Sequence, residues 1–249
     1  KDSSGLYQYD WNIPFGFNTN GKLIMWLGDI DGMDDKTKGI LKPFNIPSDH
    51  LLIDSEFYQA QMKCVFSEPI IEKRILINKE AFISNIRKKY SVDLSHLTDE
   101  CQEHEKKVKR PVVFTETAVA EVINAYDKIL IEGFNVSEMR KLYEVLYDSS
   151  ERNAKYTSWQ SIKLIEAILA KLSLSVNNLD ITSVMSPLYI LHDYRILLDH
   201  LLSADKISDT KQHIVATLGV QSFNDQESIY NEEIKRLNTL FNYLGVLSK

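Results

Sequence analysis

The stretch Ser186–Ser203 limits what this chain can fold into more than any other part of its sequence. It reads SPLYILHDYRILLDHLLS. Ser186 can cap a helix as a side-chain acceptor, and Pro187 suits the first helical position, where its missing N–H is not needed. Apolar residues then recur at helical spacing on one face of the predicted helix, and they also occupy most of its other faces. Because such a helix can expose little of its surface, we expect it at the centre of a helical bundle.

The same stretch carries ionisable side chains inside its apolar run, namely His192, Asp193, Arg195 and Asp199, with His200 next. Burying a charge without a partner is costly, so these groups should pair or line a cleft. At about 100° per residue, His192, Arg195 and Asp199 share one stripe of the helix, and Asp193 and His200 share another. Arg195 and His200 are then roughly 140° apart. Their joint action requires an irregular helix or a site built between two helices, which two subunits could supply.

Further helices are predicted on both sides of this one. Thr115 begins an amphipathic run that Gly133 stops, and Asp225 or Ser228 begins the last helix. The remaining predicted helices cover residues 137–147, 158–174 and 213–219. Short connections between helices favour an antiparallel bundle.

The front of the chain has a different pattern. Asn20-Gly21 is a strong hairpin signal because both residues tolerate positive φ. The apolar run Leu23–Leu27 predicts a strand buried on both faces, and the alternation in Glu56–Phe66 predicts another. A helix starting near Ser67 and ending near Tyr90 follows. The highly charged segment 96–110 then predicts a flexible linker that ends at Pro111.

We therefore predict an α+β chain. Its small β-containing N-terminal domain, with one long helix and the charged linker, covers residues 1–111, and its all-α bundle covers residues 112–249.

Composition narrows the possible environments of the chain. Its net charge of −6 argues against a broad nucleic-acid-binding surface, although not against a small local one. No run of about eighteen apolar residues occurs, so we expect no membrane span. The chain begins KDSSG without a methionine and has no secretion signal, so we expect an N-terminal region to precede it. Cys64 and Cys101 lack metal-site spacing, and we interpret them as the reduced thiols of a cytoplasmic protein.

Several short patterns could bind a metal, but each has a simpler interpretation. The acidic stretch GDIDGMDD lacks the spacing of a calcium loop and is typical of a solvated turn. His96 and His104 lie in the charged segment, where nothing apolar would hold them still. Asp54, Gln61 and Lys63 faintly resemble the acid-and-lysine pattern of metal-dependent nucleases, although a solvent-facing polar strand explains them as well. We therefore predict no metal and no cofactor.

The segment LHDYRILLDHL, within four to six helices, resembles the HEPN superfamily (higher eukaryote and prokaryote nucleotide-binding). Its ribonuclease members carry an arginine, four to six residues and then a histidine on a late helix of an all-α bundle. Arg195 and His200 match at the shortest gap, while Ile196 stands where many members have a polar residue. The first half, with WNIPFGFNTNGKLIMWLGDI and NIPSDH, is similar to the front part of large uncharacterised bacterial proteins that end in such a bundle.

This resemblance implies a metal-independent endoribonuclease of toxin or phage-defence (antiviral) type. Arg195 would hold the scissile phosphate, and His200 would transfer the proton of the RNA 2′-OH. His192, Asp193 and Asp199 would orient these two residues. HEPN nucleases commonly pair two bundles at one cleft, so the resemblance also implies a homodimer, with RNA as its partner, in the bacterial cytoplasm.

Two other interpretations stay open. In the first, the bundle is a non-catalytic dimerisation or regulatory module of a larger bacterial defence protein, with catalysis in the region before residue 1. The acidic balance and the missing methionine favour this interpretation. In the second, a metal nuclease is built around Asp54 and Lys63.

Overall fold

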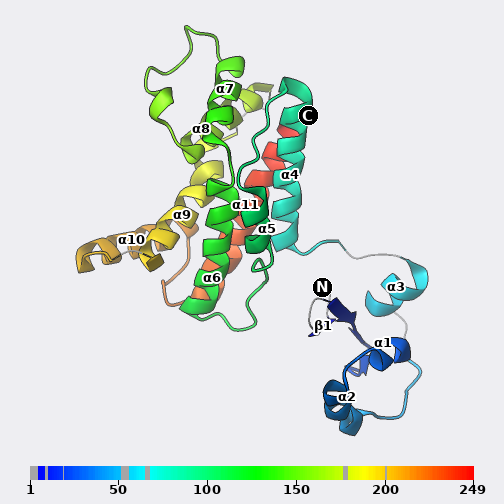
Figure 1. Ribbon diagram of the computed structural model, residues 1–249. Coiled ribbons are helices and arrows are strands. Elements are labelled where there is room, and N and C mark those ends of the chain that lie inside the picture. Colours follow the sequence, from blue (N-terminus) through cyan, green and yellow to red (C-terminus); the bar gives the residue numbers. More distant parts are fainter. Residues whose placement is uncertain are drawn as a thin grey trace. The chain divides into compact units, whose positions relative to one another are not determined.

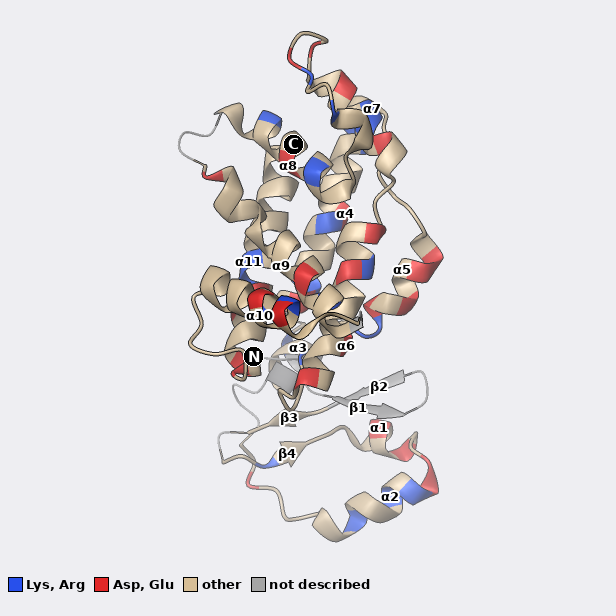
Figure 2. Cartoon of the chain, turned by 90° about the vertical axis from the view of Figure 1, so that its left-hand side faces the viewer, with Lys and Arg blue, Asp and Glu red and all other residues tan. Residues whose placement is uncertain are grey.

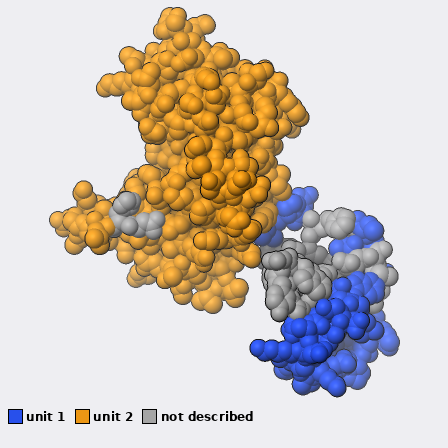
Figure 3. Space-filling model, in the orientation of Figure 1, with its two compact units in different colours: residues 1–70 blue, residues 71–249 orange. Residues whose placement is uncertain are grey.

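The chain consists of two compact units, residues 1–70 and residues 71–249 (Figure 3). A computed structural model describes residues 5–8, 11–18, 20–51, 56–64, 68–175, 179–199 and 201–249. The division after Ile70 differs from the predicted boundary after residue 111. It assigns the long helix and the charged segment to the second unit.

The first unit contains short strands and short helices. The strands form two antiparallel pairs, β1 (Gly5–Gln8) with β2 (Trp11–Pro14) and β3 (Gly16–Phe17) with β4 (Leu23–Ile24). The helical elements are α1 (Leu27–Asp31), α2 (Asp35–Leu41), η1 (Lys42–Phe44) and α3 (Glu56–Lys63). The described part of the chain as a whole is mostly helical, and the strands of its front unit are limited to these short pairs.

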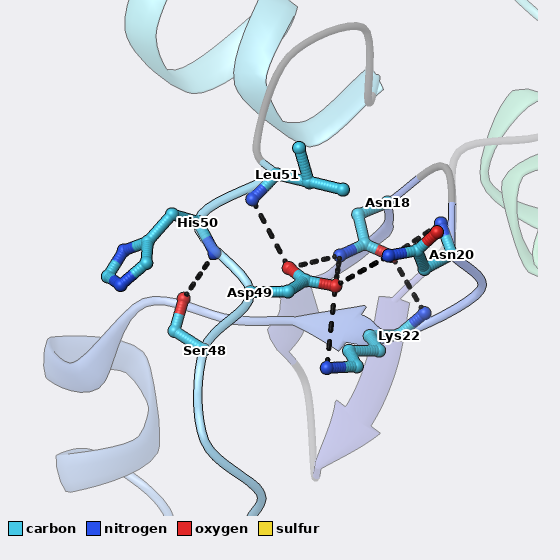
Figure 4. A network of polar contacts seen from close by, with 7 residues as sticks. All are labelled: Asn18, Asn20, Lys22, Ser48, Asp49, His50 and Leu51. Carbon is cyan, nitrogen blue, oxygen red and sulfur yellow. Dashed lines mark hydrogen bonds and ion pairs between the residues drawn. The ribbon is translucent and has the colours of Figure 1, made fainter.

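A hydrogen-bonded network around Asp49 fixes the turn between β3 and β4 (Figure 4). The Asp49 carboxylate accepts hydrogen bonds from the side-chain amides of Asn18, at 2.8 Å, and Asn20, at 3.1 Å, and it pairs with Lys22 at 3.4 Å. Burial acts to raise the pKa of Asp49, but the donated hydrogen bonds and the Lys22 charge outweigh it and lower that pKa to about 2. Gly21 has a φ of +72°, so the predicted Asn-Gly turn is confirmed.

Two strand predictions for this unit were wrong. The pairing of Leu23–Leu27 is limited to Leu23–Ile24, and Leu27 begins α1 with 81% of its surface exposed. The segment Glu56–Lys63 is α3 rather than a strand. Its sequence EFYQAQMK contains no β-branched residue, and glutamate, glutamine, alanine, methionine and lysine are good helix formers. The helix propensity of these residues therefore outweighs the alternating pattern from which a strand was predicted.

The second unit is a helical domain, as predicted. Its longest helices, α4 (Ile71–Tyr90) and α11 (Gln226–Leu247), lie side by side (Figure 1), and α11 also contacts α9 (Ile181–Asp199). The remaining elements are α5 (Thr98–Glu105), α6 (Glu116–Asp127), η2 (Lys128–Glu132), α7 (Val136–Leu146), η3 (Tyr156–Ser158), α8 (Ser161–Leu172), η4 (Ser173–Ser175) and α10 (Ala204–Leu218). One continuous apolar core runs through this unit, with buried members from Ile75 to Leu244.

Side-chain caps explain where several of these helices begin. Thr115 accepts a hydrogen bond from the Ala118 N–H at the start of α6, and Asp225 accepts one from the Ser228 N–H at the start of α11. Both starts were predicted from the sequence. The short helix expected at residues 213–219 is instead the end of the longer α10.

The central helix α9 begins at Ile181, earlier than the predicted start at Ser186. Asp180 accepts a hydrogen bond from the Ser183 N–H at its first turn, so Pro187 lies inside the helix. A proline there cannot donate to the carbonyl four residues earlier, that of Ser183. The Ser186 hydroxyl donates to this carbonyl at 2.8 Å instead, and the helix continues through the proline.

The flexible linker predicted for residues 96–110 is also wrong. Residues Thr98–Glu105 form α5, and both Cys101 and Val108 are buried. Ser95 forms an isolated antiparallel bridge with Phe134, which ties the start of this segment to the end of η2. The few apolar residues of the segment are enough to dock it on the helical core.

Among the described residues, no helix has both the length and the apolar character needed to cross a lipid bilayer.

Candidate functional site

A buried carboxylate between α6 and α9 organises the cluster of charges in the helical unit. Asp127 is the last residue of α6, which packs against α9, and its side chain is fully buried. An ionised group in such a place requires charged or hydrogen-bonding partners. Two of the sequence-predicted residues on α9, His192 and Arg195, supply them.

His192 meets Asp127 through one ring nitrogen. Its Nδ1 lies 3.2 Å from Asp127 Oδ1. This hydrogen bond raises the pKa of His192 above its ordinary value, although burial and the nearby Arg195 charge oppose the change. The His192 side chain is still 39% exposed. Because Asp127 contacts Nδ1, Nε2 is the ring nitrogen available to a reacting group.

Arg195 lies one turn along α9 and pairs with two carboxylates. Its Nη1 is 3.4 Å from Asp127 Oδ2 and 3.5 Å from Glu132 Oε1. The Arg195 side chain is 20% exposed, and its Nε atom is buried. Glu132 also accepts a hydrogen bond of 2.7 Å from Lys128. The cluster therefore brings together an imidazole, a guanidinium, an ammonium and two carboxylates.

The irregular backbone of η2 explains how Asp127 and Glu132 both reach Arg195. On a regular α-helix, two residues five apart are separated by roughly 140° and face different ways. Residues Lys128–Glu132 form a π-helical turn, whose i→i+5 hydrogen bonding stacks residues that are five apart. Such turns are rare in proteins, and those that do occur often lie at functional sites.

The other predicted site residues are only partly described. Asp193 points to α10, where its Oδ2 lies 3.8 Å from His213 Nε2. Burial raises the pKa of Asp193, while the two neighbouring histidines oppose this. The side chain of Asp199 and all of His200 lie outside the described residues. The predicted pairing of Arg195 with His200 therefore stays a prediction.

Sequence reasoning missed both carboxylates that hold Arg195. Asp127 has Ile123 four residues before it and Ile131 four residues after it, so it occupies the apolar face of its own helix. A charged residue on such a face signals a buried polar site, and this signal was available in the sequence. The alignment of Glu132 with Asp127 was not, because it depends on the π-helical turn.

The candidate metal patterns do not assemble in the described residues. No group of three or more histidine, cysteine, aspartate or glutamate side chains there could hold a metal ion. Of the acidic stretch, Asp34 caps α2 by accepting a hydrogen bond from the Thr37 N–H. Cys64 is exposed, Cys101 is buried, and neither forms a disulfide. Asp54 lies outside the described residues, as does the side chain of Gln61.

The cluster at α6, η2 and α9 has the groups needed for acid–base chemistry on an anionic substrate. A histidine held by a buried carboxylate can exchange a proton near neutral pH. An adjacent guanidinium can stabilise negative charge on a phosphate oxygen.

Comparisons with protein-family models, with curated proteins and with solved structures found no match to this chain.

Proposed function

We propose that the helical unit is a metal-independent endoribonuclease of toxin or phage-defence type, with its reacting groups on α9. One observation carries the proposal: the buried carboxylate of Asp127 contacts both a histidine and an arginine that the sequence singled out. In this proposal the helical unit is a HEPN-like bundle behind a small β-containing domain, and the protein acts in the bacterial cytoplasm.

The reaction uses the nucleophile that RNA itself carries. The 2′-oxygen attacks the neighbouring phosphorus, the bond to the 5′-oxygen breaks, and a 2′,3′-cyclic phosphate remains. One histidine takes the proton of the 2′-OH, and another acid returns a proton to the leaving 5′-oxygen. Arg195 stabilises the charge that develops on the phosphate. A homodimer supplies two such sets of residues at one cleft.

Two histidines compete for the proton-transfer role. The sequence resemblance assigns it to His200, whereas the contact with Asp127 favours His192, whose raised pKa suits it to donate a proton. His192 lies within α9, His200 follows the last residue of that helix in the sequence, and Arg195 lies between them in the chain. Single substitutions separate the two assignments.

The test is cleavage of a mixed RNA pool by the purified chain in EDTA, with analysis of the product ends. We expect cyclic-phosphate ends from the wild type and rates lower by about 10²–10³ for Arg195→Ala. The histidine that transfers the proton should show a similar loss when replaced, His192→Gln or His200→Ala. The exposed His50, in the first unit, provides the control His50→Gln, which should cleave normally.

Unchanged cleavage by Arg195→Ala would overturn the proposal. Cleavage that EDTA abolishes would point instead to the metal-dependent interpretation around Asp54 and Lys63.

A second candidate is a non-catalytic dimerisation or regulatory module. The observation in its favour is that Asp127 and Glu132 already compensate the Arg195 charge within one chain. A wild-type protein that forms dimers in sedimentation experiments and cleaves no RNA would support this candidate over the nuclease.

A further inference from the structure

A cavity of about 260 Å³ lies between α4, α5 and the end of η2, and its lining residues are different from those of the charge cluster at α6, η2 and α9. Lys79 of α4 and Cys101 of α5 are its buried walls, and Gly133 closes it. Glu80, His96 and Glu105 also line it. All of these residues belong to the second unit and are described.

Lys79 is the unusual member of this lining. Its side chain is 6% exposed, and its ammonium lies 3.7 Å from a carboxylate oxygen of Glu80 and 5.4 Å from the ring centre of Phe134. Among the described residues, none accepts a hydrogen bond from this ammonium. A lysine ammonium has three donors, and the described residues offer this one an ion pair with Glu80 and no hydrogen-bond acceptor. An acceptor placed in the cavity would therefore stabilise the Lys79 ammonium.

The charges at the rim restrict what that acceptor can be. The Glu80 side chain is 63% exposed, and Glu105 is partly exposed. Figure 2 shows acidic residues (red) along α5, the helix that carries Glu105. These carboxylates repel a simple anion, while Lys79 repels a simple cation. A molecule with both charges close together meets neither repulsion.

We propose that this cavity binds a free α-amino acid. The ligand carboxylate accepts hydrogen bonds from Lys79, and its ammonium pairs with Glu80 at the rim. The 3.7 Å between the two protein charges matches a ligand whose own charges are joined through a single carbon atom. Ser95, Thr98 and Gln102 also line the cavity, so a polar side chain such as that of glutamine suits it. The inference does not depend on the proposed nuclease activity.

Calorimetric titration of the full chain with L-glutamine tests this site. We expect saturable binding that is weakened on the order of tenfold or more in both Lys79→Met and Glu80→Gln, because each variant removes one charged partner. Glu80 is exposed, so Glu80→Gln should fold even if Lys79→Met does not. The exposed lysine Lys88 lies on the same helix, and Lys88→Met should bind as the wild type does.

Two analogues of glutamine test the requirement for both charges. Glutaramate lacks the ammonium, and 4-aminobutanamide lacks the carboxylate, so both should bind more weakly than L-glutamine by on the order of tenfold. Equal binding of glutaramate would overturn the amino-acid assignment. No binding of L-glutamine, or equal binding by the wild type and Glu80→Gln, would overturn it too.

The buried thiol of Cys101 locates the bound ligand. In a Cys64→Ser background Cys101 is the remaining cysteine. L-Glutamine should slow its alkylation by iodoacetamide, with the same concentration dependence as the calorimetric signal. An unchanged alkylation rate at saturating ligand would place the binding elsewhere and reject this site.

Discussion

At the scale of single residues, the helical unit buries several ionisable side chains in very different surroundings. Glu72 accepts a hydrogen bond of 2.9 Å from the Tyr230 hydroxyl, and Asp127 has both His192 and Arg195. Among the described residues, neither carboxylate oxygen of the buried Glu233 has a hydrogen-bond partner, whereas Asp127 has one for Oδ1 and an ion pair for Oδ2. Buried carboxylates with polar partners can stay ionised at little cost, and a buried carboxylate without a hydrogen-bond partner is expected to lower the stability of the fold.

The contact of His192 with Asp127 makes the free energy of unfolding depend on pH. Because the folded protein holds the His192 proton more tightly than the unfolded chain does, this contact adds stability below the ordinary pKa of 6.5 and loses it as the pH rises through the folded pKa. Asp127→Asn should lower the pKa of His192, as followed by NMR titration of its ring protons. An unchanged His192 pKa in the variant would contradict the contact.

Glu233 should make the protein less stable as the pH rises. Burial raises the pKa of Glu233 well above its ordinary value, although Arg236 opposes this. The unfolded chain then releases a proton that the folded chain keeps, so the free energy of unfolding falls with pH above about 4.3. Glu233→Gln should be more stable than the wild type by roughly 1–3 kcal/mol at pH 8 and by less at pH 4, measured by urea denaturation.

Its partly exposed neighbour provides the control for that measurement. Glu232→Gln, which removes the charge of a side chain that is 36% exposed, should change the free energy of unfolding by less than about 1 kcal/mol at either pH. A Glu233→Gln variant that is less stable than the wild type at pH 8 would show that the carboxyl group has a stabilising partner.

At the scale of helices and strands, the sequence indicated those elements whose signals are local. Thr115 and Asp225 cap helices as predicted, and Asn20-Gly21 forms its turn. The strand expected at Glu56–Lys63 failed because its alternation competed with strong helix propensity. The early start of α9 depends on the Ser186 hydroxyl, which replaces the hydrogen bond that Pro187 cannot make.

The candidate site was predictable only in part, because helical spacing is a local signal and contacts between helices are not. Helical spacing placed His192 and Arg195 on one stripe of α9. Their partner Asp127 lies on the apolar face of another helix, as Lys79 does between Ile75 and Ile83. Which charges meet across helices depends on packing between distant segments, which no local pattern records.

The end of η2 is the tightest backbone position near the site. A Cβ on Gly133 would lie 2.5 Å from the Ile129 carbonyl oxygen and 2.8 Å from Cys101 Sγ. Gly133→Ala should therefore destabilise the protein by about 1–3 kcal/mol in chemical denaturation. In the control Gly245→Ala, the nearest atom would be 3.4 Å away, and we expect a neutral or slightly stabilising effect. Equal effects of the two substitutions would contradict the close packing at η2.

At the scale of the whole molecule, the continuous core predicts an independent helical unit. Its buried members run from Ile75 to Leu244, so a fragment of residues 71–249 should unfold cooperatively, with a Tm within about 5 °C of that of the full chain. A fragment of residues 112–249, cut at the boundary expected from the sequence, lacks α4 and exposes the face of α11 that packs on it. Circular dichroism should show that only the longer fragment melts cooperatively. Cooperative melting of the shorter fragment would contradict the position of the boundary.

The π-helical turn makes the charge cluster depend on the number of residues in the chain as well as on their identity. If the same residues wound as a regular α-helix, the two carboxylates, five residues apart, would face directions roughly 140° apart, and the π-helical turn removes that separation. Deleting one uncharged residue between Asp127 and Glu132 would leave them four apart, roughly 40° on a regular α-helix, so the turn would no longer be needed. Two related chains with the same charged residues therefore assemble this cluster only if the length of the segment and its winding match.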